Sequence, residues 1–329
     1  MAAMKGSMAR SNRMQVVIGL AVAVVVSTMS IPPLFADSGD VTDSVASEGG
    51  DQNESFDRLG IEEPTRLARA ELVAGQTLHG VVLGMDACVI LDCESMRGRI
   101  GAVTLGAGVG LGGSLLATGN TGVTHGQASA INSGVLWGAW LGFQVGDLAG
   151  YHSRELATVM ATGQLGGMGL GYLLSEVFRP TAGDVALVNH SGLWSVLYFR
   201  LISEGILQTG FSPREAAMGL IFSSIGGGLG GVALASQMPM SRGRVVVMSS
   251  SGLLGGLVGA AIPALALGEN PGDRALMTGI TLGTAGGLLT AGYLTRTWDG
   301  DEYRPESAAL GIQPTVDGEG MLGTVSGRF

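Results

Sequence analysis

A segment of about 58 residues recurs four times between residues 65 and 298 of this chain. Aligning Trp137 with Trp194 and Leu254 gives offsets of 57 and 60 residues, and the earliest copy places His79 in the same position. Repetition at this period predicts one supersecondary unit that is copied, with neighbouring copies burying each other's apolar faces. The copies of this marker segment are 69–84 (RAELVAGQTLHGVVLG), 127–142 (QASAINSGVLWGAWLG), 184–198 (DVALVNHSGLWSVLY) and 244–259 (RVVVMSSSGLLGGLVG).

A second segment, richer in glycine, follows each marker segment. Its small residues recur at every fourth position, as in Gly163, Gly167 and Gly171. This spacing lines one face of a helix with 3.6 residues per turn, and it is not the two-residue alternation of a strand. The sequence therefore predicts an all-α fold with eight Gly-rich helices in four two-helix repeats. The Gly-rich segments are 97–118, 154–176, 214–236 and 274–296.

The glycine content points to a membrane. Glycine makes up 57 of the 329 residues, although each glycine inside a helix costs about 1 kcal/mol relative to alanine in water. In a bilayer, a face of small residues lets two helix backbones approach closely. The rows of glycine at 138, 142, 146 and 150 and at 279, 283 and 287 resemble those of the glycine-zipper class of membrane proteins. The resemblance lies in a packing motif, so it implies a membrane-embedded bundle with oligomer-prone surfaces, and it implies no activity.

Two other architectures remain open at this stage. One is a soluble helical array, and the other is an outer-membrane β-barrel, since the chain ends in Phe329. If all eight helices cross a membrane, six arginines fall on each side, so the usual excess of positive charge on the inner side is missing. The sequence does not choose between an inner and an outer membrane.

The N-terminal part has the plan of an exported bacterial protein. Residues 1–36 carry basic residues followed by an apolar run of 13 residues, which predicts a signal peptide cleaved after Ala36 or retained as an anchor. Residues 37–64 are acidic and poor in apolar groups, which predicts a disordered linker. We expect a helical repeat domain at 65–298 and a tail at 299–329 that can form a hairpin. The predicted location is the bacterial cell envelope.

The sequence offers little to support catalysis or cofactor binding. Gly108, Gly110 and Gly113 match a dinucleotide fingerprint as a string, but no acidic residue follows until Asp147, and similar clusters recur with the repeat. The repeat region has no basic face, which argues against nucleic acid as a partner. We therefore predict no enzyme, no cofactor and no metal, with the lipid bilayer, other membrane proteins or further copies of the chain as partners.

Cys88 and Cys93 lie just after the first marker segment. In an oxidising compartment they can form a disulfide that pins the turn into the next helix. Free structural thiols and a metal site are the alternatives, although a metal site would need further ligands nearby.

A polar patch recurs inside the marker segments and is the best functional signal. Serine, asparagine and histidine in an apolar helix can hydrogen-bond to neighbouring helices, or they can line a shared polar cavity. On the second interpretation Asn132 and Asn189 face the same interior space. The patch consists of Asn132, Ser133, Asn189, His190, Ser191, Ser249 and Ser250, with Ser251 as its last serine.

These features favour a non-catalytic envelope protein with a structural, scaffold or pore-like role. The alternative is a small-solute transporter or channel that uses the polar patch.

Overall fold

The computed structural model describes residues 62–119, 122–268 and 272–299, together with two short strands at 309–314 and 321–326. The chain divides into two compact units, Met1–Asn53 and Glu54–Phe329, and every described residue belongs to the second. The predicted signal peptide and residues 37–61 of the predicted linker lie outside the described residues.

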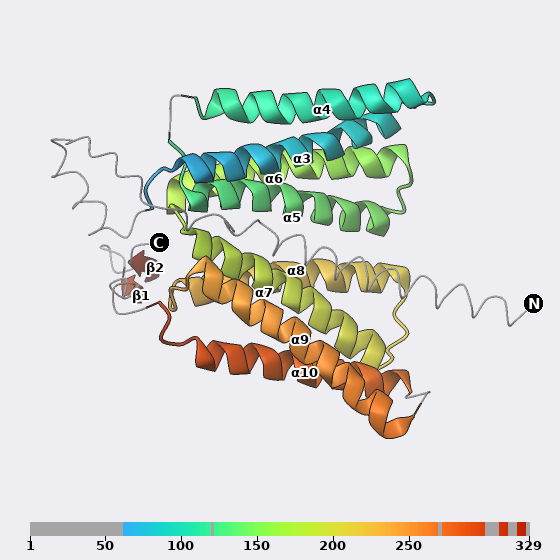
Figure 1. The fold of residues 1–329 in the computed structure, drawn as a ribbon, viewed down its shortest axis with the longest axis vertical. Helices are drawn as coiled ribbons and strands as arrows, with labels where there is room; N and C mark the ends of the chain where they lie inside the picture. Colours follow the sequence, from blue (N-terminus) through green and yellow to red (C-terminus); the bar gives the residue numbers. More distant parts are fainter. Residues whose placement is uncertain (1–61, 120–121, 269–271, 300–308, 315–320, 327–329) are drawn as a thin grey trace, which may run out of the picture. The chain divides into compact units, whose positions relative to one another are not determined.

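Eight α-helices make up most of the described residues, as predicted, and they exclude the β-barrel alternative (Figure 1). A π-helical segment, η1 (Leu201–Ile206), continues α7. Strands β1 (Ala309–Pro314) and β2 (Met321–Ser326) pair antiparallel, with Ala309 opposite Ser326. The helices are α3 (Arg66–Ile90), α4 (Met96–Ala117), α5 (His125–Ala149), α6 (Arg154–Phe178), α7 (Ala182–Arg200), α8 (Pro213–Ala235), α9 (Arg242–Leu267) and α10 (Asp273–Leu294).

The marker helices α3, α5, α7 and α9 begin at side-chain caps. Thr124 accepts a hydrogen bond from the backbone N–H of Gln127, whose side chain bonds back to Thr124. Thr181 and Asp184 form the same reciprocal box at α7. These boxes satisfy N–H groups that have no partner within the helix and fix where α5 and α7 start, while Thr65 and Ser241 cap α3 and α9 by a single bond.

Consecutive helices pair through their glycines. Helices α3 and α4, α5 and α6, and α9 and α10 pack so closely that an added Cβ would overlap the backbone of the partner. A Cβ on Gly138 would overlap the carbonyl oxygen of Gly163, and one on Gly163 would overlap that of Gly138. In the α7–α8 pair, a Cβ on Gly227 would overlap the Ser195 side chain, and one on Gly231 would lie 2.7 Å from the backbone Cα of Val188. All four pairs therefore need glycine where their backbones meet.

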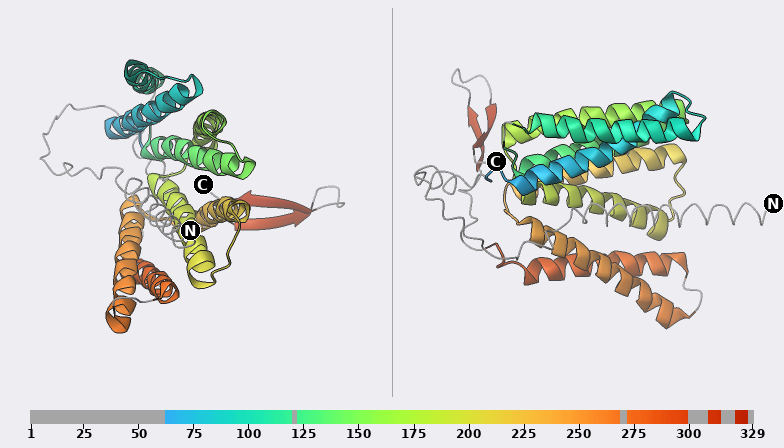
Figure 2. Two further views of the ribbon diagram at one scale, coloured as in Figure 1. Left: turned by 90° about the vertical axis from the view of Figure 1, so that its right-hand side faces the viewer. Right: turned by 45° about the horizontal axis from the view of Figure 1, so that its top comes forward.

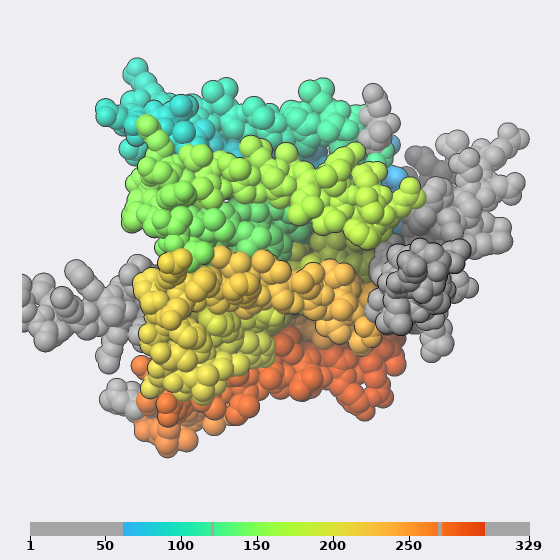
Figure 3. All heavy atoms as spheres, turned by 180° about the vertical axis from the view of Figure 1, so that it is seen from behind, coloured from blue at the N-terminus to red at the C-terminus, as the bar shows by residue number. Residues whose placement is uncertain are grey.

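The pairs then stack in chain order. Each marker helix lies against the next one, from α3 to α9. Each of the Gly-rich helices α6, α8 and α10 also packs on the pair of helices before its own (Figure 2). Helix α6 contacts α3, α8 contacts α5, and α10 contacts η1, which continues α7. Seen from behind, α6 and α8 lie between α4 and α10 (Figure 3).

Five of the described helices, α3, α4, α8, α9 and α10, are long and apolar enough to cross a membrane. Their outward faces carry large apolar side chains such as Leu116, Leu229 and Leu289, all exposed. A contiguous apolar exterior of this kind is unfavourable in water. These features fit an integral membrane protein and indicate a membrane location.

The glycine contacts can be tested with a matched pair of substitutions in α6. Gly163→Ala places a methyl group against the Gly138 carbonyl, so we expect destabilisation of about 1–3 kcal/mol, typical of an overpacked contact. Gly166→Ala meets open space, so we expect no loss and a gain of up to about 1 kcal/mol from helix propensity. Thermal unfolding of the purified protein in detergent measures both; equal effects would show that the close approach is not what requires glycine.

Candidate functional site

The polar patch forms hydrogen bonds from each marker helix to the next. Between α5 and α7, the indole Nε1 of Trp137 donates to Oδ1 of Asn189 over 2.9 Å. The Asn189 amide nitrogen in turn donates to Oγ of Ser133 over 2.6 Å. Both polar ends of the Asn189 amide are thus bonded to α5, so this side chain joins two helices.

The same contact recurs between α7 and α9. The Trp194 Nε1 donates to Oγ of Ser249 over 3.2 Å. A Cβ added at Gly252 would lie 2.7 Å from the Trp194 ring, and one added at Gly192 would lie 2.7 Å from the Trp137 ring. Each tryptophan therefore lies over a glycine of the next helix, which leaves room for the ring beside its hydrogen-bond acceptor.

The contact between α3 and α5 uses other side chains at the same level. Gln76 Nε2 donates to Oδ1 of Asn132 over 2.9 Å, and the Asn132 amide nitrogen donates to the Glu71 carbonyl over 3.3 Å. His79, in the tryptophan position, hydrogen-bonds to the backbone of Asn132. We call these three successive sets of hydrogen bonds the polar ladder; its acceptor side chains are Asn132, Asn189 and Ser249.

The remaining predicted residues have other partners. His190 Nδ1 bonds to the Ala186 carbonyl of its own helix over 2.8 Å. Ser191 faces α8: a Cβ added to Gly231 of that helix would lie 3.0 Å from the Cβ of Ser191. Ser250 is half-buried. Asn132 and Asn189 bond at two successive helix interfaces, so the patch is distributed along the array.

Sequence analysis identified the acceptors but not their donors, Gln76, Trp137 and Trp194. The signal was available, because Trp137 and Trp194 occupy one phase of the repeat and each follows a patch residue by five positions. Their role as donors depends on the packing of each marker helix against the next, which lies outside the local sequence.

A second polar cluster joins the first and last marker helices near their N-terminal ends. Arg242 of α9 donates from one nitrogen to both Glu71 oxygens of α3, at 3.0 and 2.9 Å. Ser129 and His125 of α5 also bond to Glu71, at 3.0 and 3.1 Å. The Glu71 carboxylate thus joins α3 to both α5 and α9.

Glu62 lies in the part of the predicted linker that the structure describes, and it bonds to two helix starts. Its two carboxylate oxygens accept from the backbone N–H of Gly126, over 2.6 Å, and of Ala182, over 2.8 Å. A carboxylate is stabilised at helix N-termini by the unpaired N–H groups and the helix dipole. Glu62 thus bridges the starts of α5 and α7.

Asp299 likewise accepts a hydrogen bond from a backbone N–H at the start of a marker helix, here α9. It accepts from the Ser241 N–H over 3.0 Å and pairs with Arg244 over 2.9 Å, and both charged side chains are 9% exposed. Burial alone would raise the pKa of Asp299, but the hydrogen bonds from Ser241 and Arg244 outweigh it and hold the pKa below its ordinary value of 3.8. The negative charge is therefore favoured in the folded protein.

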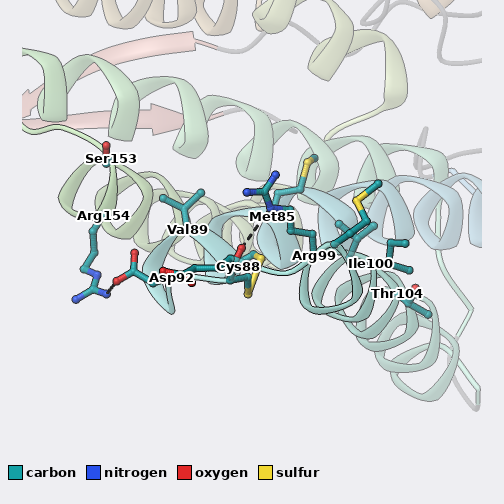
Figure 4. A pocket seen from close by; sticks show the side chains of 13 residues that line it. Met85, Cys88, Val89, Asp92, Arg99, Ile100, Thr104, Ser153 and Arg154 are labelled. Atoms are coloured by element: carbon teal, nitrogen blue, oxygen red, sulfur yellow. Dashed lines mark hydrogen bonds and ion pairs between the residues drawn. A yellow bond between two sulfur atoms is a disulfide. The ribbon is translucent and has the colours of Figure 1, made fainter.

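Cys88 and Cys93 form a disulfide where α3 turns into α4. An open hollow of about 780 Å³ lies beside this turn (Figure 4). Met85, Val89 and Ile100 give it apolar walls. At its rim, Arg154 pairs with Asp92 and Arg99 donates to the Cys93 carbonyl, so both arginines already hold the turn in place. The hollow offers mainly apolar surface.

Comparison with known proteins adds no relative to this picture. No protein-family model matches the chain, and no curated protein and no solved structure is significantly similar to it. Within the described residues, no group of three or more His, Cys, Asp and Glu side chains is placed to hold a metal ion.

The polar ladder predicts unequal effects for two tryptophans of α5. Trp137→Phe removes the donor to Asn189, and we expect a loss of about 0.6–2 kcal/mol, the range for hydrogen bonds between membrane helices. Trp140→Phe is the matched control, because its Nε1 has no hydrogen-bond partner in the described structure. Unfolding in detergent measures both, and a cycle with Asn189→Ala isolates the coupling. If the ladder bond does not stabilise the protein, the two tryptophan variants will lose equal stability, and the cycle will show no coupling between Trp137 and Asn189.

The Asp299 contacts predict a pH dependence of stability. Because the folded pKa is depressed, this stabilisation is complete above the ordinary value of 3.8 and disappears as the pH falls through the folded value. Asp299→Asn should lower the unfolding temperature at pH 7, and the difference from the wild type should shrink below about pH 4. Asp273→Asn, at an exposed position, serves as the control. A difference independent of pH would rule out the carboxylate as its source.

Proposed function

We propose that the chain is a non-enzymatic integral membrane protein with a structural or scaffold role, built from four copies of a two-helix unit. The polar ladder is the observation that carries the proposal. Its amide, indole and hydroxyl groups bond to one another between helices, and this is how polar side chains hold membrane helices together. A protein that binds a solute needs such groups to be free for the solute.

Two kinds of contact support the repeat and the glycine-zipper packing. Trp137 and Trp194 make equivalent bonds to equivalent residues of the next copy, which is expected if one unit was copied. Gly255 with Gly283, and Gly259 with Gly279, approach each other as Gly138 and Gly163 do. Small residues at every fourth position are the usual means of such close approach in a bilayer.

The proposed location is a membrane of the bacterial cell envelope, reached by export. The support is the basic and apolar sequence of residues 1–36. The Cys88–Cys93 disulfide agrees with this location, because disulfides persist in oxidising compartments such as the periplasm.

Extraction and flux measurements test this function. We expect the protein to stay in the membrane pellet after alkaline carbonate treatment of a cell-envelope fraction and to need detergent for release. In liposomes loaded with a series of small polar solutes, we expect no flux above that of protein-free liposomes.

Release by carbonate would show that the helices form a soluble or peripheral array. Retention together with flux would identify a transporter or channel instead of a scaffold. In that case Asn189→Leu should alter the flux, and Trp140→Phe should leave it unchanged.

A further inference from the structure

The ladder stops at α9 because the residues that would continue it are missing. In α3, α5 and α7 the ladder position that faces the next copy holds His79, Trp137 or Trp194, each of which bonds to the next copy. The same position in α9 holds Leu254, which is 63% exposed. Leucine has no donor to offer to a fifth copy.

Other residues of the same α9 face are open as well. Gly126 and Gly183 lie against the Pro180 and Met240 carbonyls of the following copy, whereas the equivalent Gly243 has nothing within 4 Å of an added Cβ. Leu257 and Val258 lie one turn beyond Leu254 and are 68% and 62% exposed. In α5 and α7 this face is covered by the next copy. The equivalent face of α9 is apolar and uncovered.

The first copy lacks the matching acceptors. Asn132, Asn189 and Ser249 accept bonds from the preceding copy, and the equivalent residue of α3 is Ala74, which is exposed.

Among the Gly-rich helices, the first copy also has alanine where later copies have a hydrogen-bonding side chain. Gln164 of α6 bonds to Asp86, and Thr284 of α10 bonds to Tyr198, each on the preceding copy. The equivalent residue of α4 is Ala107, since Gly106 and Gly163 make the same contact in their pairs. Alanine thus replaces a hydrogen-bonding residue at both of these positions of the first copy.

We propose that these two end faces are built to contact lipid acyl chains, so that the array ends at four copies instead of continuing into a second molecule. This rests on the proposed membrane function. Unpaired hydrogen-bonding groups are costly in hydrocarbon, and the terminal copies of repeat proteins carry outer faces that suit their solvent. In a bilayer, the solvent at the end of the array is hydrocarbon.

A second copy is the competing occupant, and the ladder argues against it. A molecule that continued the array would place its α3 against α9, so that position 254 would meet position 74. Between α5 and α7 and between α7 and α9 this meeting pairs a tryptophan donor with an acceptor side chain, and at the ends it would pair Leu254 with Ala74. Removal of both partners removes the interaction that holds successive copies together.

Spin labels on single added cysteines test the proposal in lipid nanodiscs, because Cys88 and Cys93 are paired with each other. Leu254→Cys and Ala74→Cys report on the end faces. Val135→Cys, at a position 2% exposed between helices, is the buried control, and Leu289→Cys, at a position 75% exposed on α10, is the lipid-facing control. Collisions with oxygen report contact with lipid, and collisions with a nickel chelate report contact with water.

The proposal expects both end-face labels to match Leu289→Cys, with frequent oxygen collisions and rare nickel collisions. End-face labels that match Val135→Cys would overturn it, and dipolar coupling between their spins would then identify a second copy as the occupant. Frequent nickel collisions at the end faces, with Leu289→Cys still in lipid, would overturn the end-face proposal and leave the membrane function standing. Frequent nickel collisions at Leu289→Cys as well would overturn the membrane function and the end-face proposal together.

Discussion

Contact between helix backbones at glycine is the constraint on which the other contacts depend. In the α5–α6 pair, Gly138 and Gly163 leave no room for a side chain, so the two helices meet through main-chain atoms. Such pairs gain dispersion contacts over a large area, and they are narrow enough to stack closely on the next pair. The stacking in turn brings Trp137 within hydrogen-bond distance of Asn189. The glycines that the ladder itself needs are Gly192 and Gly252, over which the Trp137 and Trp194 rings lie.

The polar groups then give the stack its order. Apolar packing alone has little preference for one neighbour over another in a bilayer, because lipid tails are as apolar as leucine. A tryptophan N–H that meets an asparagine oxygen sets both the neighbour and the register. At the N-terminal ends, Glu62 and Asp299 bond to the starts of marker helices, and the Glu71–Arg242 pair links the first marker helix to the last. Charged groups thus lie near the helix ends, while neutral donors and acceptors form the middle of the ladder.

The sequence predicted the helices well because the relevant physics is local. Periodic glycines and the caps at Thr124 and Thr181 placed the starts of the marker helices close to the observed ones, whereas three of the four helices continue beyond the predicted end, as α9 does to Leu267. It identified Asn132 and Asn189 as unusual, since a polar residue in an apolar helix needs a partner. Those partners lie on other copies, 56 residues away for Gln76 and 52 for Trp137, and they depend on the order in which the pairs stack. The role of Glu62 was missed for a related reason: its local composition is that of a linker, and its two partners belong to distant helix starts. Ser191, only two residues after Asn189, faces a different helix because two residues turn a helix by about 200°.

Both tryptophan hydrogen bonds of the ladder run from one marker helix to the following one, and this bears on how such an array grows and ends. Trp137 and Trp194 donate to the following marker helix, whereas Asn132 and Asn189 also donate back to the preceding one. A pair that has formed therefore leaves donors unsatisfied until the next pair packs against it, and in hydrocarbon an unsatisfied donor favours that packing strongly. The α3–α4 pair thus prepares the surface for α5–α6, and so on along the chain. In α9 the tryptophan position holds Leu254, and on the proposal that the end faces meet lipid the array ends there. On that proposal, the side chain at one repeated position contributes to the size of the array together with chain length.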